Sequence, residues 1–381
     1  MSLTLSDGIK TENKPASEPV AADEFRVHFS RGFPAWLLEQ KASLAISTYQ
    51  AGKILLVGFN KKGEVSIVER TISRCMGIAA DQNAQNLYVA GIHNISRFVN
   101  AIQPGQDHPD FDRIYVPQVT YTTGDIDTHD MAIDANGDLI FVNTLFSCLC
   151  TLSATHSFVP IWHPPFITDL LPEDRCHMNG FCLNENGEPG YVTAVSETDL
   201  SGAWRDNRRD GGIVIDVQTN KIIASGLSMP HSPRMHNGKL YIQNAGTGHL
   251  GTIDLKTGEF TEICFLPGFL RGLTFCKSGS GNFALCGVSK KRKDRSFQGL
   301  DLDENLKQHK VEAKCGVYII DLNNGANIHH IEFEGYLEEL YDVHVLHGTQ
   351  RPNIIGFMKD EIRRMYVVGE KPDLLKKAND S

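Results

Sequence analysis

The sequence predicts an all-β protein and, within that class, a single-domain β-propeller with six or seven blades. Three observations lead to this fold class. A short apolar strand, a Gly/Asn turn and a second apolar strand recur along the chain. A third strand, which runs into a Gly-containing turn, recurs later in several units. The units repeat at roughly 50 residues with almost no helical periodicity, which is typical of propeller blades.

The strands of the unit can be aligned along the chain. The first strand is found at residues 44–47, 76–81, 130–134, 179–184, 231–235, 271–275 and 342–346. The second strand follows at residues 87–90, 139–142, 191–195, 240–243, 283–287 and 354–357, and the third at residues 212–216, 250–255 and 317–322. Seven first strands favour seven blades. The first and last units are short, however, so they form either two trimmed blades or one blade shared where the ring closes.

Residues 25–369 are therefore expected to form one propeller domain. Residues 1–24 are rich in Ser, Thr, Lys, Glu and Pro, which predicts a disordered tail, and residues 370–381 are expected to be a flexible tail. The N-terminal tail lacks the apolar region of a signal peptide. No stretch reaches the ~18–20 apolar residues of a membrane span. We therefore expect a soluble, cytoplasmic protein without a membrane partner.

Charge and cysteine content narrow the functional classes. The formal net charge is −9, which argues against nucleic acid as the main ligand. Nine cysteines is an odd number without a regular framework, and several lie inside apolar strands. This pattern favours reduced core thiols over disulfides. The segment 246–251 spells the glycine fingerprint of dinucleotide-binding proteins, but a strand and a turn follow it instead of the required helix.

Four long connections interrupt the regular spacing, at residues 102–113, 160–174, 196–211 and 290–314. Long propeller insertions gather on one face and commonly wall a site there. The third contains Trp204 and Arg205, an aromatic ring beside a guanidinium, which suits a ligand or lid surface. The alternative is an exposed loop that one tryptophan anchors. The basic run at residues 289–295 is interpreted as a solvated loop in this acidic chain.

Polar residues stand at the starts of the aligned first strands. Because the innermost strands of a propeller surround its axis, these residues should converge at one mouth of the central channel. They predict a divalent transition metal (Fe, Zn or Cu) bound by three histidines, with four catalytic residues beside it. The predicted metal ligands are His129, His177 and His231, and the predicted catalytic residues are Asp130, Asn179, Arg271 and Asp342.

Two other interpretations of the same residues stay open. The histidines can instead act as acid and base, while Arg271 and Arg234 hold an anionic substrate bidentately. Alternatively, His and Asp at strand starts form hydrogen bonds that lock neighbouring blades. The residues predicted to contact substrate are Arg234, Trp204, Arg205 and Glu339. If the nearby carboxylates are engaged elsewhere, an arginine can bind carboxylate, phosphate or sulfate, which predicts a small anionic ligand.

Five motifs give the chain a resemblance to a known family: GDIDTHDMA at 124–132, RCHMNG at 175–180, GLSMPHSPR at 226–234, LPGFLRGL at 266–273 and ELYDV at 339–343. Together they resemble an uncharacterised bacterial family with a domain of unknown function, over about residues 25–369. The resemblance implies a propeller fold and supplies no reaction.

Two functional hypotheses follow. The first is a metal-assisted hydrolase or oxidoreductase that acts on a small polar, anionic molecule at the axial mouth. The second is a non-catalytic propeller scaffold that binds protein or ligand, in which the axial His/Asp/Arg cluster is structural. A protein partner fits the second hypothesis.

Overall fold

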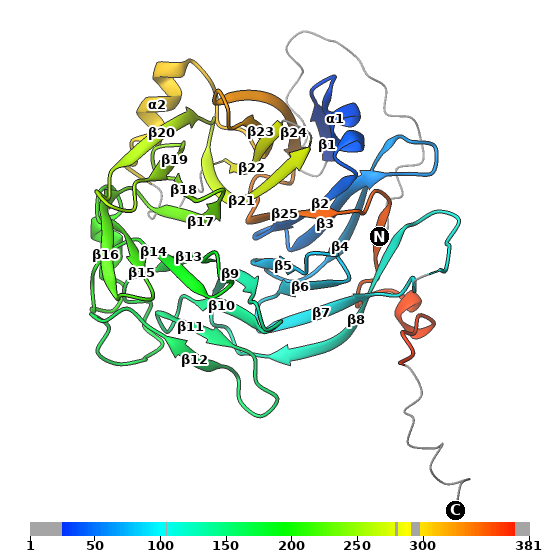
Figure 1. Ribbon diagram of the computed structural model, residues 1–381, viewed down its shortest axis with the longest axis horizontal. Coiled ribbons are helices and arrows are strands. Elements are labelled where there is room, and N and C mark those ends of the chain that lie inside the picture. The colour runs from blue at the N-terminus through cyan, green and yellow to red at the C-terminus, as the bar shows by residue number, and fades with distance from the viewer. Residues whose placement is uncertain (1–24, 104, 279–280, 291–297, 370–381) are drawn as a thin grey trace, which may run out of the picture.

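Six sheets, each with at least four antiparallel strands, stand around a central axis in the computed structural model, which describes residues 25–103, 105–278, 281–290 and 298–369 (Figure 1). Each innermost strand contacts the innermost strand of the next sheet, in the ring order β5, β9, β13, β17, β21, β25 and back to β5. This arrangement is a six-bladed β-propeller. The expected tails, residues 1–24 and 370–381, lie outside the described residues.

Four blades are built from strands that follow one another along the chain, from the axis outwards. The first contains β5 (Ile78–Ala80), β6 (Asn86–Ala90), β7 (Asn94–Asn100) and β8 (Arg113–Thr122). The second contains β9 (Thr128–Ile133), β10 (Leu139–Asn143), β11 (Cys148–Thr151) and β12 (Val159–Trp162). The third contains β13 (Met178–Leu183), β14 (Pro189–Ala194), β15 (Gly212–Asp216) and β16 (Lys221–Leu227). The fourth contains β17 (Pro230–His236), β18 (Lys239–Asn244), β19 (His249–Ile253) and β20 (Phe260–Phe265).

The last two blades combine strands from both ends of the chain. The fifth contains β21 (Phe269–Ser278), β22 (Gly281–Ser289), β23 (Gly316–Asp321), β24 (Ala326–Gly335) and, at its outer edge, β1 (Phe25–Phe29). The sixth contains β25 (Asp342–His347), β2 (Ala42–Thr48), β3 (Lys53–Phe59) and β4 (Val65–Thr71). The C-terminal strand β25 therefore closes the ring by pairing with the N-terminal strand β2, from Ala42 opposite His347 to Ser47 opposite Asp342.

The blade number follows from this closure. Residues 44–47, counted in the sequence as a separate first strand, belong to β2, the second strand of the sixth blade. Six blades result, one of the two numbers that the sequence allows. Residues 354–357 were expected to form the second strand beside β25, but β2 already occupies that position. The chain instead forms β26 (Pro352–Ile354), which pairs in parallel with the outer strand β8 of the first blade.

Two short α-helices were not predicted from the sequence. In α1 (Phe33–Glu39) the buried residues Phe33, Trp36 and Leu37 recur at helical spacing, and the helix packs against β2 and β24. The second helix, α2 (Leu302–His309), lies in the long connection 290–314. The described residues also include two 3-10 helices, η1 (Ala203–Asn207) and η3 (Asp360–Arg363). In the part of the chain that the structure describes, no helix is long and apolar enough to cross a membrane.

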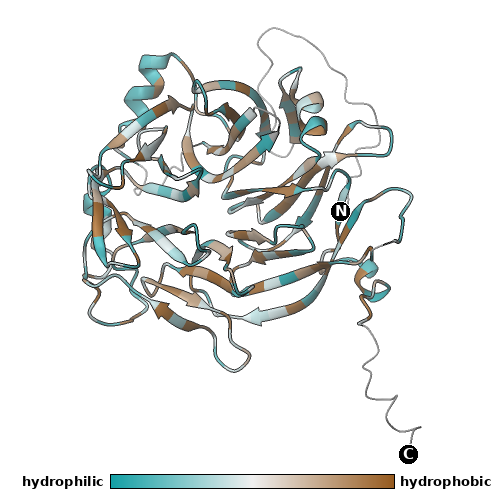
Figure 2. Ribbon diagram, in the orientation of Figure 1, coloured by the Kyte–Doolittle hydropathy of each residue, from teal (hydrophilic) through white to brown (hydrophobic). Residues whose placement is uncertain are grey.

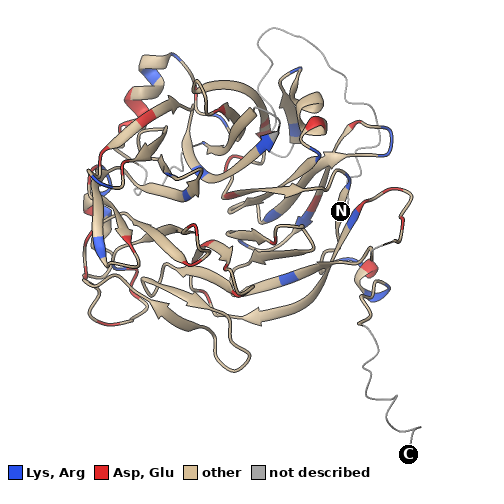
Figure 3. Cartoon of the chain, viewed as in Figure 1, with Lys and Arg blue, Asp and Glu red and all other residues tan. Residues whose placement is uncertain are grey.

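The hydrophobic core lies between neighbouring blades, because central strands bury both faces. Strands β3 and β10 are buried along almost their whole length, which explains their nearly continuous apolar sequences (Figure 2). Lys, Arg, Asp and Glu lie mainly on loops and strand ends around the ring (Figure 3). All nine cysteines fall within the described residues and are free thiols, as the sequence predicts.

The innermost strands share an irregularity near their first residues. In β9, β13, β17 and β21 the pairing with the second strand shifts register within the first few residues. Such bulges bend a strand and re-aim its side chains, and they are frequent beside active sites. In β21 the bulge includes Gly272, which has a φ of +81°, and a Cβ there would lie 2.6 Å from the backbone nitrogen of Val343. Glycine at this position therefore lets the fifth and sixth blades approach closely at the axis.

Candidate active site at the mouth of the channel

Three histidines enter the mouth from consecutive blades. His129 and His231 are the second residues of β9 and β17, and His177 directly precedes β13. Asp127 (φ 57°), His177 (φ 51°) and Met229 (φ 46°) adopt the left-handed backbone conformation where the chain turns into these strands. Non-glycine residues rarely adopt this conformation, and it is frequent at functional sites.

Hydrogen bonds fix the proton position on two of the imidazoles. Nδ1 of His129 lies 2.9 Å from the carbonyl oxygen of Asp127, and Nδ1 of His231 lies 2.8 Å from the carbonyl oxygen of Met229. A carbonyl oxygen can only accept, so each Nδ1 carries the proton. In the neutral ring Nε2 is then left with a lone pair. Nε2 of His231 is buried and has no hydrogen-bond partner among the described residues.

His177 forms a dyad with Asp174, a residue of the loop before β13. Nδ1 of His177 donates to the Asp174 carboxylate, whose two oxygens lie 2.9 Å away. The indole Nε1 of Trp204 donates to the same carboxylate at 2.8 Å, and the Trp204 ring stacks on the His177 ring with centroids 3.9 Å apart. Asp174 therefore orients the imidazole, and Trp204 holds both groups in place.

The two flanking histidine rings and Arg271 surround the dyad. The rings of His129 and His177 lie 5.0 Å apart in an edge-to-face arrangement. The Arg271 guanidinium lies over the Tyr341 ring at 4.7 Å, and its Nη1 is 3.5 Å from Oε1 of Glu339. Arg271 and Glu339 are both buried, at 4% and 5% exposure. The mouth thus contains the three imidazoles, the Arg271 guanidinium and the carboxylates of Asp174 and Glu339. The aromatic rings of Trp204 and Tyr341 pack against them.

Burial decides the protonation of this cluster. Burial lowers the pKa of His129 to about 3, and the charges of His177 and Arg271 act in the same direction against that of Asp127. Burial and the charge of Arg271 hold the pKa of His231 well below its usual value. Burial acts against the Asp174 carboxylate, but the charge and hydrogen bond of His177 and the hydrogen bond of Trp204 outweigh it and lower its pKa. His129 and His231 are therefore neutral at pH 7.

Asp130 and Arg234 lie one level deeper in the channel and pair with each other. The two terminal nitrogens of Arg234 donate to the two Asp130 oxygens at 2.8 and 2.9 Å. Arg234 also donates to the carbonyl oxygens of Phe181 and Leu273, and the backbone nitrogen of Phe181 donates to Asp130. These bonds join four consecutive blades, the second to the fifth. Both side chains therefore join blades, and the catalytic role expected for Asp130 and the substrate-binding role expected for Arg234 stay predictions.

Asn179 and Asp342 also connect neighbouring blades. Nδ2 of Asn179 donates to the carbonyl oxygen of Pro230 at 3.1 Å, which links the third and fourth blades. Oδ2 of Asp342 accepts from the backbone nitrogen of Ile78 at 3.0 Å, which links the sixth and first blades. These are the blade-locking hydrogen bonds that the sequence left as one interpretation of polar strand starts.

The long connection 196–211 contains two residues predicted to contact substrate, Trp204 and Arg205, and only Trp204 reaches the mouth. Trp204 in η1 is 3% exposed and contacts the dyad. The Arg205 guanidinium lies over the Trp204 ring, 4.4 Å from its centroid, and Arg205 is exposed. Arg205 thus supports Trp204 from outside and does not line the cluster.

Sequence reasoning missed Asp174 and Tyr341. Both stand beside a residue that was identified: Asp174 three positions before His177, and Tyr341 directly before Asp342. For Tyr341 the available signal was its position within the motif 339–343, whereas Asp174 directly precedes the motif 175–180. The role of Asp174 could not be read from spacing, because it depends on the left-handed turn at Asp174 itself (φ 46°).

The three histidines do not form a complete ligand set with a carboxylate or thiolate in this conformation. Among the described residues, no group of three or more His, Cys, Asp or Glu side chains is placed to hold a metal ion. A metal at the mouth therefore requires the imidazoles to move towards a common point at the ~2 Å ligand distance.

Comparison with known proteins identifies the fold and the family. Among solved structures, the chain is similar to one in a nidogen/laminin complex, with 12% identity over 81% of this chain and 99% of that chain and a TM-score of 0.50. It is also similar to a protein of unknown function from Bacteroides caccae (10% identity, 80% and 98% coverage, TM-score 0.48) and to a gluconolactonase from Xanthomonas campestris (12%, 84% and 89%, 0.48). At such identities the likeness concerns the fold alone.

A search of curated proteins finds no match. A family model, by contrast, matches residues 31–355, which include every strand of the six blades except β1 at the outer edge of the fifth. The match spans all the residues of the mouth described above. The chain belongs to the family described as domain of unknown function DUF4915.

Proposed function

We propose that this protein is an enzyme that converts a small polar, anionic molecule by acid–base chemistry at the mouth of the channel. The observation that carries the proposal is the Asp174–His177 dyad. A carboxylate that holds Nδ1–H leaves Nε2 of the same ring available to take up or release a proton. No hydrogen bond joins Nε2 of His177 to another described side chain, and His177 keeps 8% of its surface exposed.

The neighbouring groups supply binding and charge stabilisation. Arg271 is the group for a negative oxygen of the substrate. Its Nη1 lies 3.5 Å from Oε1 of Glu339, and a guanidinium has five N–H donors, so Arg271 can bind a substrate oxygen while it stays paired with Glu339. Nε2 of the neutral His129 and His231 accepts hydrogen bonds from the hydroxyl or amine groups of the substrate.

The first test is a search for turnover. Purified protein is incubated with a mixture of small carboxylates, lactones, carboxylic esters and phosphate esters, and consumption is followed by mass spectrometry. We expect at least one anionic compound to be consumed. His177→Gln should lower kcat/KM by about 10²–10⁴-fold, because general acid–base groups contribute on that order. Arg271→Lys should raise KM, because lysine keeps the charge but loses the planar fork.

His156→Gln, on an exposed loop, is the matched control and should retain full activity. Circular dichroism of each variant verifies the fold. If no compound is consumed, or if His177→Gln is as active as the His156 control, the acid–base proposal fails. A folded, inactive protein that captures a binding partner would instead support a non-catalytic scaffold.

A second candidate function is metal-assisted hydrolysis or oxidation. It is favoured by the choice of ring nitrogen in the hydrogen bonds of the three histidines. His129, His177 and His231 all commit Nδ1 to a carbonyl or carboxylate oxygen. Metal-binding histidines usually show this arrangement, since it fixes the ring and directs Nε2 to the ion. Bound there, Fe, Zn or Cu would polarise a substrate or activate water or dioxygen.

The metal content of the purified protein tests the metal-assisted function. Protein is produced without a His tag in medium that contains Fe, Zn and Cu, and is analysed by mass spectrometry of the metals. The metal candidate predicts about one equivalent per chain, which His177→Ala should remove with little change in melting temperature, because the closed ring forms without the site. His156→Ala should keep the metal. Less than a tenth of an equivalent in the wild-type protein would contradict the candidate.

A further inference from the structure

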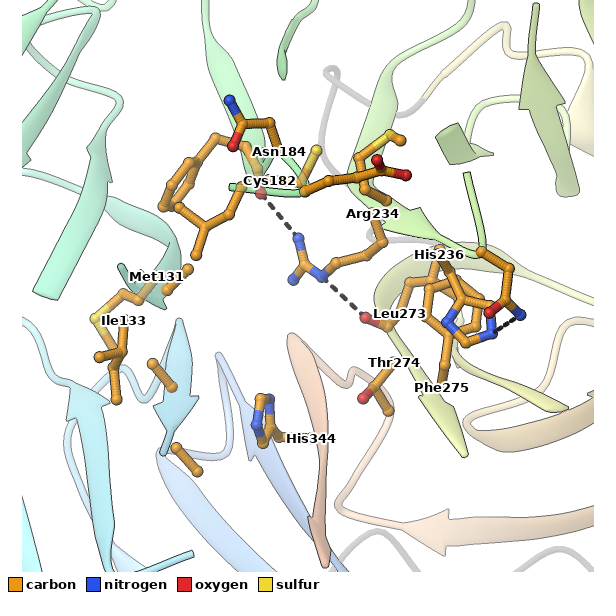
Figure 4. A pocket seen from close by; sticks show the side chains of 18 of the residues that line it. Met131, Ile133, Cys182, Asn184, Arg234, His236, Leu273, Thr274, Phe275 and His344 are labelled. Atoms are coloured by element: carbon orange, nitrogen blue, oxygen red, sulfur yellow. Dashed lines mark hydrogen bonds between the residues drawn. The ribbon is translucent and has the colours of Figure 1, made fainter. Parts of the chain in front are cut away.

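A cavity lies on the axis at the end opposite the histidine mouth. Its volume is about 390 Å³, and residues from all six innermost strands line it (Figure 4). Consecutive residues of β9 show how it relates to the mouth. His129 belongs to the mouth, Asp130 to the ion pair with Arg234, and Met131 to the cavity wall. The Asp130–Arg234 pair is therefore the inner boundary of a second compartment.

Apolar and polar groups share the cavity wall almost equally. Met131, Ile133, Phe181 and Leu273 contribute side chains from three of the strands. A volume of this size is within the usual range for small-molecule sites, which are mostly apolar with a few polar groups. This cavity thus has the volume of such a site, with apolar side chains for the body of a ligand and polar groups to orient it.

Apart from the exposed Glu185 carboxylate, two polar side chains in the cavity have no hydrogen-bond partner among the described residues. They are His344 of β25 and Thr274 of the neighbouring strand β21, and the two lie on the same side of the space in Figure 4. By contrast, His236 at the rim lies 2.6 Å from Oδ1 of Asn282, and Arg234 is fully engaged. His344 and Thr274 are thus the groups that a ligand can satisfy.

The charged side chains around the cavity restrict the charge that a bound ligand can carry. The guanidinium of Arg234 is already matched by Asp130 in a two-point pair. Burial and the charge of Arg234 lower the pKa of His344 to about 4, so its imidazole is neutral at pH 7. An anionic ligand would lose its hydration here without gaining a counterion, and a cationic ligand could pair only with Glu185, whose exposed carboxylate offers a weak ion pair. An uncharged ligand avoids this penalty.

We propose that the axial cavity is a second binding site, for a small uncharged molecule with an apolar body and one or two hydrogen-bonding groups that pair with His344 and Thr274. The apolar body contacts Met131, Phe181 and Leu273. The neutral imidazole of His344 accepts from a hydroxyl or N–H group or donates to a carbonyl, depending on its tautomer. The site is independent of the chemistry proposed for the mouth.

Phenol, benzoate and toluene are matched probes for this site. Phenol has an apolar ring and one neutral hydroxyl, benzoate has a charge in its place, and toluene has no polar group. Binding is followed by calorimetry and by the imidazole NMR signals of His344, assigned with His344→Gln. We expect phenol to bind saturably and to shift His344, and toluene and benzoate to bind at least about tenfold more weakly, since a hydrogen bond lost in a buried site costs roughly that factor.

Thr274→Val keeps the shape of the side chain but removes its hydroxyl, and His344→Phe removes the imidazole nitrogens. At least one of the two should weaken phenol binding about tenfold, whereas Thr219→Val on an exposed turn should not. His177→Gln should also leave phenol binding unchanged, which separates this site from the proposed active site. Phenol binding that neither cavity variant weakens, benzoate binding as tight as that of phenol, or no saturable shift of His344 would overturn the proposal.

Discussion

Replacing Arg234 with Met should lower the free energy of unfolding by about 3–5 kcal/mol, the usual cost of removing one partner from a buried ion pair. The variant leaves the Asp130 carboxylate, which is 3% exposed, without its counterion. It also removes the hydrogen bonds from Arg234 to the carbonyl oxygens of Phe181 and Leu273. Urea denaturation followed by circular dichroism measures the loss.

The double variant Arg234→Met with Asp130→Asn should recover more than half of that loss, because it leaves no uncompensated charge. It also keeps the test valid if the single variant does not fold. Lys307→Met serves as the control, since the Lys307–Glu304 ion pair on α2 is exposed, and it should change stability by less than about 1 kcal/mol. A single variant at Arg234 that is as stable as this control would contradict the structural role of the pair.

The stability of the Asp342→Asn variant relative to wild type should increase as pH rises from 5 to 8. Burial, and then the charge of Asp130, raise the pKa of Asp342 from 3.8 to about 7, against the opposing charge of Arg234 and hydrogen bonds from the backbone nitrogens of Ile78 and Val343. Between these two pKa values the folded state holds a proton that the unfolded state has released. The contribution of Asp342 to stability therefore falls as pH rises through this window and is lowest above pH 7.

Comparison of the variant with wild type at each pH isolates this effect. The buried histidines of the mouth act in the opposite direction, since their lowered pKa values cost stability as pH falls, and their contribution cancels in the difference. Denaturant midpoints at pH 5, 6, 7 and 8 provide the measurement. Asp138→Asn, on an exposed turn, should give a difference that does not change with pH. The same flat profile for Asp342→Asn would show that its pKa is not raised.

Much of the architecture could be predicted from the sequence, because the strands and turns of a blade are specified by short stretches of residues. Alternating apolar residues and Gly/Asn turns located the innermost strands β9, β13, β17, β21 and β25, and their starts identified the residues of the mouth. His129, His177, His231 and Arg271 do come together there, as the repeat alignment predicts. This succeeded because equivalent positions of a repeated unit must lie at the same height around the axis.

The sequence alone thus determined the propeller class, the repeat and the residues that meet at one mouth, because these depend on short-range periodicity. The tertiary structure decided what those residues contact. Blade number depends on β25 pairing with β2, almost the whole chain away, and no local pattern records that pairing. The contacts of Asp130 and Asp174 depend likewise on partners: Asp130 pairs with Arg234 two blades away, while Asp174 reaches His177 through a left-handed turn and orients it. Equivalent polar residues at one height become structural or functional according to which neighbouring blade satisfies their hydrogen bonds, and that is a property of the closed ring.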